Sequence, residues 1–569
     1  MNSDNKINYV IFFVLSFAII LGYSILFPPP KPVVEETAKK EKISDSIDDE
    51  LIDNAGTVSK SIDTPKAKDE NIFKRLDDKS SPYSTSENLI TVESPLYTGK
   101  IDPLGARIVE WKLDKYKEST QNGSQEYNLF SDSPPSFNLG VRASFEDIPN
   151  PIPFSYAGSK DIVLKDDAKE LEFVWKSPGG ITISKTYNIS PNSYLVTSTI
   201  RIINTTGKTI KHIVSVDTYS SSLKIDSQGR SKEFIALVSD EVQKESSNPE
   251  QTIEYAGKIE WFGFLDKYFL YTFLPESDDT NKVKFSSISG GEELVRATYS
   301  YPAYELKPGN ERPYKSKLYL GPLQVDSLKK ADPELRHAMD FGWFDFLAKP
   351  VLSLLNYMNK YFNNYGISII VITILIRVIF LPLTIKSMAS MKEVQVKMQT
   401  LKPKIDALKE KYKDDKQKQN QEMMNMYTAH GVNPLSSLGG CLPMLIQIPV
   451  FIALYEVLLN SIDLRHSAFL WINDLSEAEV LFDIPGIGIP FRILPLAMGV
   501  SWFISQKMTP MTTPGSDQME LQMKMMQFMP IIFTVMFWGL PSGLVLYWTV
   551  SNILSIVQQL YVNKKTAKH

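Results

Sequence analysis

Residues 367–388 form an apolar stretch that is long enough to cross a lipid bilayer as a single helix. The stretch reads ISIIVITILIRVIFLPLTIKSM, and Arg377 stands alone in its middle among Ile, Val, Leu and Thr. A charge at the centre of a membrane helix costs about 2.5–3.5 kcal/mol even on the insertion scale that gives the lowest values. The fold therefore has to supply this arginine with a partner, with water or with a route to the membrane surface.

Five further apolar segments predict that the chain crosses the membrane with six α-helices in total. They are residues 1–27, 441–460, 489–506, 522–540 and 542–562. The last two are separated by GLPSG, whose glycines and proline permit a tight turn. We interpret residues 1–27 as an uncleaved anchor, because FPPPKP follows the apolar run instead of a cleavage site of small residues. A cleaved signal peptide is the alternative.

The chain between the first two spans has a different composition. Residues 28–88 hold 24 charged residues out of 61, which predicts a disordered linker. Residues 89–325 contain short alternating runs such as ARIVEWKL and YLVTSTIRIIN, which predict a large all-β sandwich. Residues 326–366 return to a helical period. They predict either an amphipathic helix region at the membrane interface or a helix that packs on the β domain.

The distribution of lysine predicts the side of the membrane that each loop occupies, because cytoplasmic loops carry an excess of Lys and Arg. Residues 386–418 contain ten lysines and five acidic residues, and the tail 563–569 is basic. Residues 461–488 contain one arginine and five acidic residues. We therefore expect both termini, the long loop after the second span and loop 507–521 in the cytoplasm. Loop 461–488 and the β domain then lie outside it.

Residues 389–432 are predicted to form a helical hairpin in the cytoplasm. Apolar side chains recur there at spacings of three and four residues, the pattern of a coiled-coil seam. The predicted seam positions are Met391, Met398, Leu401, Ile405, Leu408 and Tyr412. Its methionines either pack within the hairpin or present an adaptable surface to varied apolar partners. Its lysines suit a solvated face near anionic phospholipid, and could also meet ribosomal RNA.

Three arrangements are open for the charge of Arg377. Glu456 is the one acidic residue well inside a predicted core span, but its predicted depth differs from that of Arg377 by about 9 Å. Snorkelling to the surface is disfavoured in the middle of the membrane. A water-filled cavity inside the bundle is the third arrangement, and intramembrane charges usually face such cavities.

Polar residues on the predicted spans favour the cavity. Thr373 lies four residues before Arg377 and therefore shares its helix face. Further candidates to line the same space are Gln447, Tyr547, Ser551 and Asn552. Each of them alone is equally compatible with an ordinary hydrogen bond between helices.

A set of motifs in fixed order resembles a known family. ITILIRVIFLPLTIKSMASM, GVNPLSSLGGCLPMLIQIPVFIALY and FMPIIFTVMFWGLPSGLVLYWTVSNILSIVQQ look like the YidC insertases of bacteria, which have relatives in mitochondria and chloroplasts. The anchor, linker and outer β domain fit the Gram-negative form. The resemblance implies a bacterial inner-membrane protein with a periplasmic β domain that resembles sugar-binding enzymes and has no established catalysis.

The resemblance also implies site residues. The family's five-helix core forms a hydrophilic groove, whose arginine maps to Arg377 and whose face partner maps to Thr373. The paired aromatics of the last span map to Tyr547 and Trp548, although the family commonly has tyrosine at the second position. The surface along which substrate slides maps to Ile448, Phe451, Met536 and Phe537. Glu456 is atypical for the family.

The predicted function is the insertion and folding of nascent inner-membrane proteins, alone or with the Sec translocon and components of the ribosome or signal-recognition pathway. No cofactor, metal site or enzymatic activity is expected. The chain has no P-loop motif, and its five histidines do not have zinc-ligand spacing. The alternatives are a small-anion transporter with Arg377 as ligand, and an envelope protein that acts on glycans through its β domain.

Overall fold

The fold is described from a computed structural model, which defines residues 85–566 with internal gaps. The gaps are 122, 132, 145, 222, 224–231, 278–279, 289–293, 342–343, 414, 431–441, 486–487, 489 and 509–516. The predicted anchor 1–27 and nearly all of the predicted linker 28–88 lie outside the described residues. The chain divides into two compact units, which meet between Met339 and Asp340. We call them the β domain and the helical unit.

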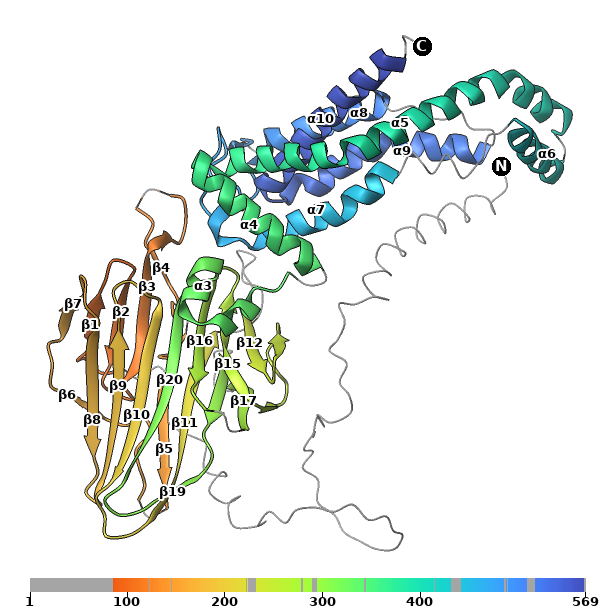
Figure 1. The fold of residues 1–569 in the computed structure, drawn as a ribbon. Helices are drawn as coiled ribbons and strands as arrows, with labels where there is room; N and C mark the ends of the chain where they lie inside the picture. The colour runs from red at the N-terminus through yellow and green to blue at the C-terminus, as the bar shows by residue number, and fades with distance from the viewer. Residues whose placement is uncertain are drawn as a thin grey trace, which may run out of the picture. The chain divides into compact units, whose positions relative to one another are not determined.

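The β domain contains three sheets. The nine-stranded sheet has the order β13 (Glu241–Glu245), β12 (Lys232–Val238), β15 (Ile259–Asp266), β16 (Phe269–Pro275), β20 (Glu311–Pro322), β10 (Leu195–Asn204), β9 (Ile181–Ile189), β8 (Lys169–Lys176) and β6 (Ser155–Tyr156). The second sheet has the order β14 (Ile253–Gly257), β17 (Asn281–Ile288), β18 (Leu294–Ser300), β11 (Ile210–Ser221) and β19 (Tyr304–Leu306), and β5 (Asn138–Ala143) also pairs with β11. The third has the order β4 (Glu126–Asn128), β3 (Arg107–Lys117), β2 (Tyr97–Asp102), β1 (Ile90–Glu93) and β7 (Asp161–Val163). Figure 1 shows the long strands β8, β9, β10 and β20 side by side.

Aromatic side chains join the large sheet to the two smaller ones. Phe234 of β12 stacks on Phe285 of β17 with ring centroids 4.5 Å apart. Tyr127 of β4 stacks on Phe269 of β16 at 4.0 Å. Alternate residues of β10 are buried, as expected for strands with one face on a core. The predicted all-β sandwich is confirmed in this domain.

The β domain continues beyond its last strand. Helix α3 (Val325–Ala331) and the 3-10 helix η1 (Pro333–Ala338) follow β20. The indole Nε1 of Trp261 donates a hydrogen bond to the carbonyl of Glu334 at 3.1 Å, and Leu328 and Leu335 are fully buried. The predicted region 326–366 is therefore not one element, because its first third packs on the β domain.

The helical unit contains seven helices in its described residues. They are α4 (Asp345–Phe362), α5 (Tyr365–Lys411), α6 (Lys416–Ala429), α7 (Leu442–Asn460), α8 (Ile493–Met508), α9 (Asp517–Met536) and α10 (Ser542–Thr566). Short elements connect them: η4 (Ile462–Leu464), β21 (Phe482–Asp483), β22 (Pro490–Phe491) and η5 (Phe537–Gly539). Helix α10 packs against α5 and α8, α8 packs against α9, and α4 packs against α5 and α7.

Two boundaries differ from the prediction. The second predicted span and the first hairpin helix are one continuous helix, α5, because the chain passes from apolar to lysine-rich sequence without a helix breaker that ends it. The fourth span begins at Ile493 instead of residue 489, because Pro490 and Phe491 pair with β21. The buried face of α4 consists of Ala348, Val351, Leu352 and Leu355.

The hairpin consists of the second half of α5 and of α6. Met398, Leu401 and Ile405 form one buried cluster with Met423 of α6, and Leu408 and Tyr427 pack against it. Tyr412 ends the first helix, with Lys411 and Lys418 near its ring. Figure 1 shows α6 beside the far end of α5. Burial of Met398 favours packing within the hairpin over an exposed methionine surface. The side chain of Met391 lies outside the described residues.

Exposed apolar residues distinguish the two units. Of the large apolar side chains that the described residues expose, only Val163 and Tyr304 belong to the β domain. The helical unit exposes many on each of α5, α8, α9 and α10, for example Ile379 at 70% and Val535 at 71%. Such faces are typical of helices that contact lipid. By length and hydropathy, α5 is the one described helix that meets the criteria for a membrane span, so the count of six spans stays a prediction.

His212 is a buried titratable group in the β domain. Its side chain is 1% exposed on β11, and its Nε2 lies 2.8 Å from the hydroxyl of Tyr314. Burial and the nearby guanidinium of Arg312 lower the pKa of His212 from 6.5 to about 4. The folded domain therefore holds a neutral imidazole where the unfolded chain takes up a proton.

We expect the β domain to lose stability as pH falls from 6.5 to 4, because the unfolded state binds the proton first. The part due to His212 is about 3 kcal/mol at most. His212→Gln should remove this part of the pH dependence. Hydrogen exchange of β11 peptides in the detergent-solubilised chain measures it, with pH 7.5 as the reference. An unchanged loss in the variant would refute the assignment.

Candidate functional site in the helical bundle

The guanidinium of Arg377 is held by a serine of another helix. Its Nε donates to the Oγ of Ser551 on α10 at 3.1 Å, and a second guanidinium nitrogen donates to the same oxygen. Arg377 is half-buried and Ser551 is 5% exposed. Among the described residues, no carboxylate forms an ion pair with Arg377. The charge is therefore hydrogen-bonded without being neutralised.

Glu456 has another contact. Its Oε2 accepts a hydrogen bond from the amide of Asn460, four residues later on α7, at 3.0 Å. The ion pair between Glu456 and Arg377, one of the three arrangements open from sequence, is not formed in this structure. The predicted difference in depth is a sufficient reason, because closing it would require both side chains to extend along the membrane normal.

Thr373 lies on the expected face, but its hydroxyl donates its hydrogen bond within the same helix. The side chain is 1% exposed, and its Oγ1 donates to the carbonyl of Ile369 at 2.6 Å. This is the common i−4 bond of threonine within a helix. Thr373 therefore lies one turn from Arg377, and its hydroxyl donates within its own helix and not to another helix.

Gln447 and Tyr547 connect a third helix to this region. The amide of Gln447 on α7 donates to the hydroxyl of Tyr547 on α10. Tyr547 is 1% exposed and lies one helical turn before Ser551. We call Arg377, Gln447, Tyr547 and Ser551 the arginine cluster. It brings polar groups of α5, α7 and α10 together inside an apolar bundle.

Asn552 does not belong to the arginine cluster, which corrects the prediction. Its amide donates to the carbonyl of Met498 at 3.4 Å and to the hydroxyl of Ser501 at 3.3 Å, both on α8. Adjacent residues of a helix point about 100° apart, so Ser551 and Asn552 serve different neighbours. Here the alternative of an ordinary hydrogen bond between helices holds.

Trp548 forms the centre of an aromatic cluster with rings of four other elements. Its ring centroid lies 4.7 Å from Phe451 on α7, 5.2 Å from Phe537 on η5 and 5.6 Å from Trp502 on α8. Phe533 on α9 completes the cluster through Trp502, at 4.7 Å. Trp502 and Phe533 were not predicted, because the sequence of an apolar helix does not show whether an aromatic side chain faces lipid or a neighbouring helix.

Comparisons with known proteins bear on both units. Residues 357–569 match the family model described as 60Kd inner membrane protein, and residues 89–354 match the model of the YidC periplasmic domain. The protein named "Membrane protein insertase YidC" from Pelobacter propionicus is 36% identical over 97% of this chain and 98% of its own length. Its namesake from Geobacter sulfurreducens is 38% identical over 83% and 85%.

The chain belongs to the YidC family. The resemblance seen in the sequence is thereby confirmed. By the matched models, the β domain is the YidC periplasmic domain and the helical unit is the inner-membrane part. The relatives are named as insertases and not as enzymes.

Solved structures show weaker likeness. One titled as an active YidC insertase has a TM-score of 0.34 and 18% identity, over 83% of this chain and 92% of that chain. A galactose mutarotase-like protein from Lactobacillus casei has a TM-score of 0.29 and 10% identity, over 41% of this chain and 99% of its own.

The four residues that the resemblance assigns to a substrate slide are not equivalent in the structure. Ile448 on α7 and Met536 on α9 are 43% and 55% exposed, whereas Phe537 is 5% exposed and lies in the aromatic cluster with Phe451. The exposed apolar face of α9 extends over residues that sequence comparison did not single out. They are Phe528, Ile531, Ile532 and Val535.

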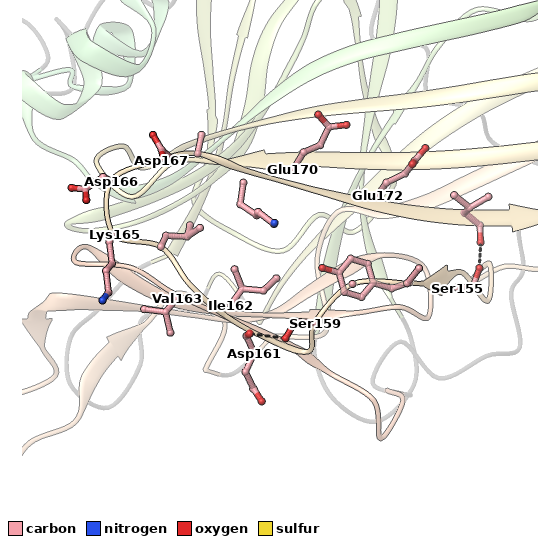
Figure 2. Close-up of a pocket in the computed structure, with 17 residues that line it drawn as sticks. Ser155, Ser159, Asp161, Ile162, Val163, Lys165, Asp166, Asp167, Glu170 and Glu172 are labelled. Atoms are coloured by element: carbon pink, nitrogen blue, oxygen red, sulfur yellow. Dashed lines mark hydrogen bonds between the residues drawn. The ribbon is translucent and has the colours of Figure 1, made fainter.

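The YidC periplasmic domain contains a cavity of about 890 Å³, lined by residues between Ser155 and Val174. Figure 2 shows Asp161, Asp166, Asp167, Glu170 and Glu172 around it. These carboxylates are exposed. Within the described residues, no group of three His, Cys, Asp or Glu side chains is arranged to hold a metal ion.

We expect Trp548→Ala to destabilise the helical unit by about 3 kcal/mol, because it removes one ring from contact with four others and leaves a cavity. Circular dichroism during unfolding in mixed micelles measures the change. Val535→Ala is the matched control, since this side chain is 71% exposed and should cost little. Equal effects of the two substitutions would contradict the packing role of Trp548.

Proposed function

We propose that this protein inserts nascent membrane proteins into the bacterial inner membrane and assists their folding. Membership of a family whose relatives are named membrane protein insertases supports the activity. The single observation that carries the mechanism is the guanidinium of Arg377, which is half-buried and hydrogen-bonded to a neutral hydroxyl. A cation that is fixed in place but not neutralised is available to an anionic group of a substrate.

We infer that the arginine cluster lies in a hydrated groove open to the cytoplasm. Intramembrane charges are stable where they face water or a partner, and the described partner of Arg377 is neutral. The side chains of Gln447 and Tyr547 add further hydrogen-bonding groups on the α7 and α10 sides. Water in such a groove would shorten the apolar distance that a polar segment of the substrate has to cross.

The proposed topology has six spans with both termini in the cytoplasm. Helices α5, α7, α8, α9 and α10 would form the membrane core, and the anchor 1–27 would be the first span. The excess of lysine in residues 386–418 supports a cytoplasmic hairpin. The second half of residues 326–366, helix α4, would lie at the periplasmic membrane interface, where its exposed Phe346, Tyr357 and Tyr361 suit the headgroup region.

Insertion would proceed without a nucleotide. The acidic or polar flank of a nascent segment enters the groove, where Arg377 attracts it. The apolar segment then moves along the exposed faces of α7 and α9, at Ile448 and Met536, into lipid. Burial of its apolar surface contributes about 25 cal/mol per Å². The membrane potential adds about 2.3 kcal/mol for each negative charge that moves outward across 100 mV.

The hairpin is the proposed docking element for cytoplasmic partners. Its apolar seam is internal, so its outer surface is polar, with exposed lysines such as Lys402 and Lys404. This charge suits anionic phospholipid and the ribosome, which carries RNA. For larger substrates we propose cooperation with the Sec translocon and with the signal-recognition pathway.

We expect Arg377→Ala and Arg377→Glu to lower insertion of a short substrate with an acidic flank at least tenfold, and Arg377→Lys to retain much of it. The reason is that attraction of the flank depends on a positive charge at this depth. Protease protection of the exported flank measures insertion in cells depleted of their own insertase.

A substrate with a neutral flank is the control for general damage to the bundle. Normal insertion of the acidic substrate by Arg377→Ala would refute the charge-attraction step. A small-anion transporter would instead show saturable solute flux that does not depend on a nascent chain.

A further inference from the structure

Helices α5 and α10 are joined by polar contacts at three places along their length. Arg377 contacts Ser551, and the amide of Gln558 donates to the Oγ1 of Thr384. Both pairs are separated by 174 residues in the chain, so the two contacts are seven residues apart on each helix. The ammonium of Lys392 lies 3.5 Å from Oδ1 of Asn563 further along. We call these three pairs the α5–α10 seam.

The order of the contacts shows that the two helices run parallel and in fixed register. Seven residues are two helical turns, so Ser551 and Gln558 lie on one face of α10, and Arg377 and Thr384 lie on one face of α5. A slip by one turn would break both hydrogen bonds together.

Three residues of the seam are buried, and the hydroxyls among them are already oriented. Ser551, Thr384 and Gln558 are between 5% and 8% exposed. The hydroxyl of Thr384 lies 3.1 Å from the carbonyl of Phe380, to which it can donate its proton, so its lone pair can accept from Gln558. Ser551 accepts two N–H groups of the same guanidinium, which fixes the plane of that group as well as its position.

Separation of α5 from α10 would expose these polar groups to lipid, where each one without a partner is costly. The faces of α7 and α9 differ in this respect. Their large exposed apolar side chains, such as Ile448 and Met536, lose nothing in contact with lipid. The polar contacts therefore resist the separation of α5 from α10. The exposed faces of α7 and α9 do not resist opening toward lipid in this way.

We propose that Ser551 is the positioning residue of Arg377, and that the α5–α10 seam stays closed throughout insertion while substrate leaves past α7 and α9. This inference deepens the proposed function and rests on it. Ser551 holds the guanidinium toward the substrate's anionic flank, and the rest of the seam keeps α5 and α10 together as one wall.

The first test uses Ser551→Ala, Ser551→Thr and the control Ser555→Ala. Ser555 is the same residue type one turn further along α10, and its hydroxyl donates to the carbonyl of Ser551 in its own helix. Two substrates that differ only in an acidic or neutral flank are inserted in depleted cells. We expect Ser551→Ala to reduce insertion of the acidic substrate about fivefold and to spare the neutral one. Ser551→Thr and Ser555→Ala should insert both normally.

An equal loss of both substrates would show a structural role and overturn the positioning assignment, as would unchanged or improved insertion of the acidic one. The Arg377→Ala variant, measured in parallel, distinguishes a failure of the proposed function from a failure of the role assigned to Ser551. Normal insertion by Arg377→Ala refutes the proposed function. A defect in Arg377→Ala together with normal Ser551→Ala refutes only the role of Ser551.

The second test links the helices covalently. Thr384→Cys and Gln558→Cys, in a chain with Cys441→Ser, are bridged by a short bis-methanethiosulfonate. We expect insertion to continue when the seam is linked. Bridging Ile448→Cys on α7 to Met536→Cys on α9, at the proposed exit, should block insertion.

Loss of insertion on linking α5 to α10, with activity before linking, would overturn the closed seam. If the first pair is inactive before linking, Lys392→Cys with Asn563→Cys tests the same seam at its far end. Continued insertion with α7 linked to α9 would overturn the proposed exit.

Discussion

The helical unit is organised around a cation that has to be kept inside an apolar bundle. The fold gives the guanidinium of Arg377 a serine hydroxyl as its partner instead of a carboxylate. A carboxylate would neutralise the charge and remove its effect on any incoming anion. A hydroxyl accepts hydrogen bonds from the guanidinium and does not neutralise its positive charge. The close pairing of α5 and α10 follows from this requirement.

The β domain contains a buried lysine whose side chain is stabilised in a different way. Lys185 is 2% exposed, and its ammonium donates to the carbonyls of Ala106 and Phe137 at 2.8 and 2.6 Å. Burial holds the pKa of Lys185 well below its usual value. Backbone carbonyls of two loops fix Lys185 where it closes the core, whereas Arg377 faces one side-chain oxygen. The first arrangement serves packing, and the second leaves the charge accessible to a partner.

The sequence predicted those features that follow from periodicity and composition. Alternating strands, apolar spans and the hairpin seam are local patterns, and Met398, Leu401 and Ile405 lie together as their spacing requires. It could not predict which face of a uniformly apolar helix meets a neighbour. For this reason Ser551 and Asn552 were assigned to one space although they serve different helices, and Trp502 and Phe533 were missed. The resemblance supplied Trp548, whose ring contacts come from four other elements, α7, α8, α9 and η5.

The continuity of α5 has a mechanical consequence. One helix carries both the Arg377 guanidinium and the hairpin seam, and 28 residues from Arg377 to Ile405 at 1.5 Å each place the two about 42 Å apart. A rod of this length transmits a small tilt at one end as a large displacement at the other. Pro382 lies inside the helix five residues beyond the arginine and removes one hydrogen bond of its ladder, so bending is concentrated there. A load on the hairpin would therefore bend α5 close to the arginine, and the contacts of Thr384 with Gln558 and of Lys392 with Asn563, which lie between the bend and the hairpin, would meet it before the bond to Ser551 does.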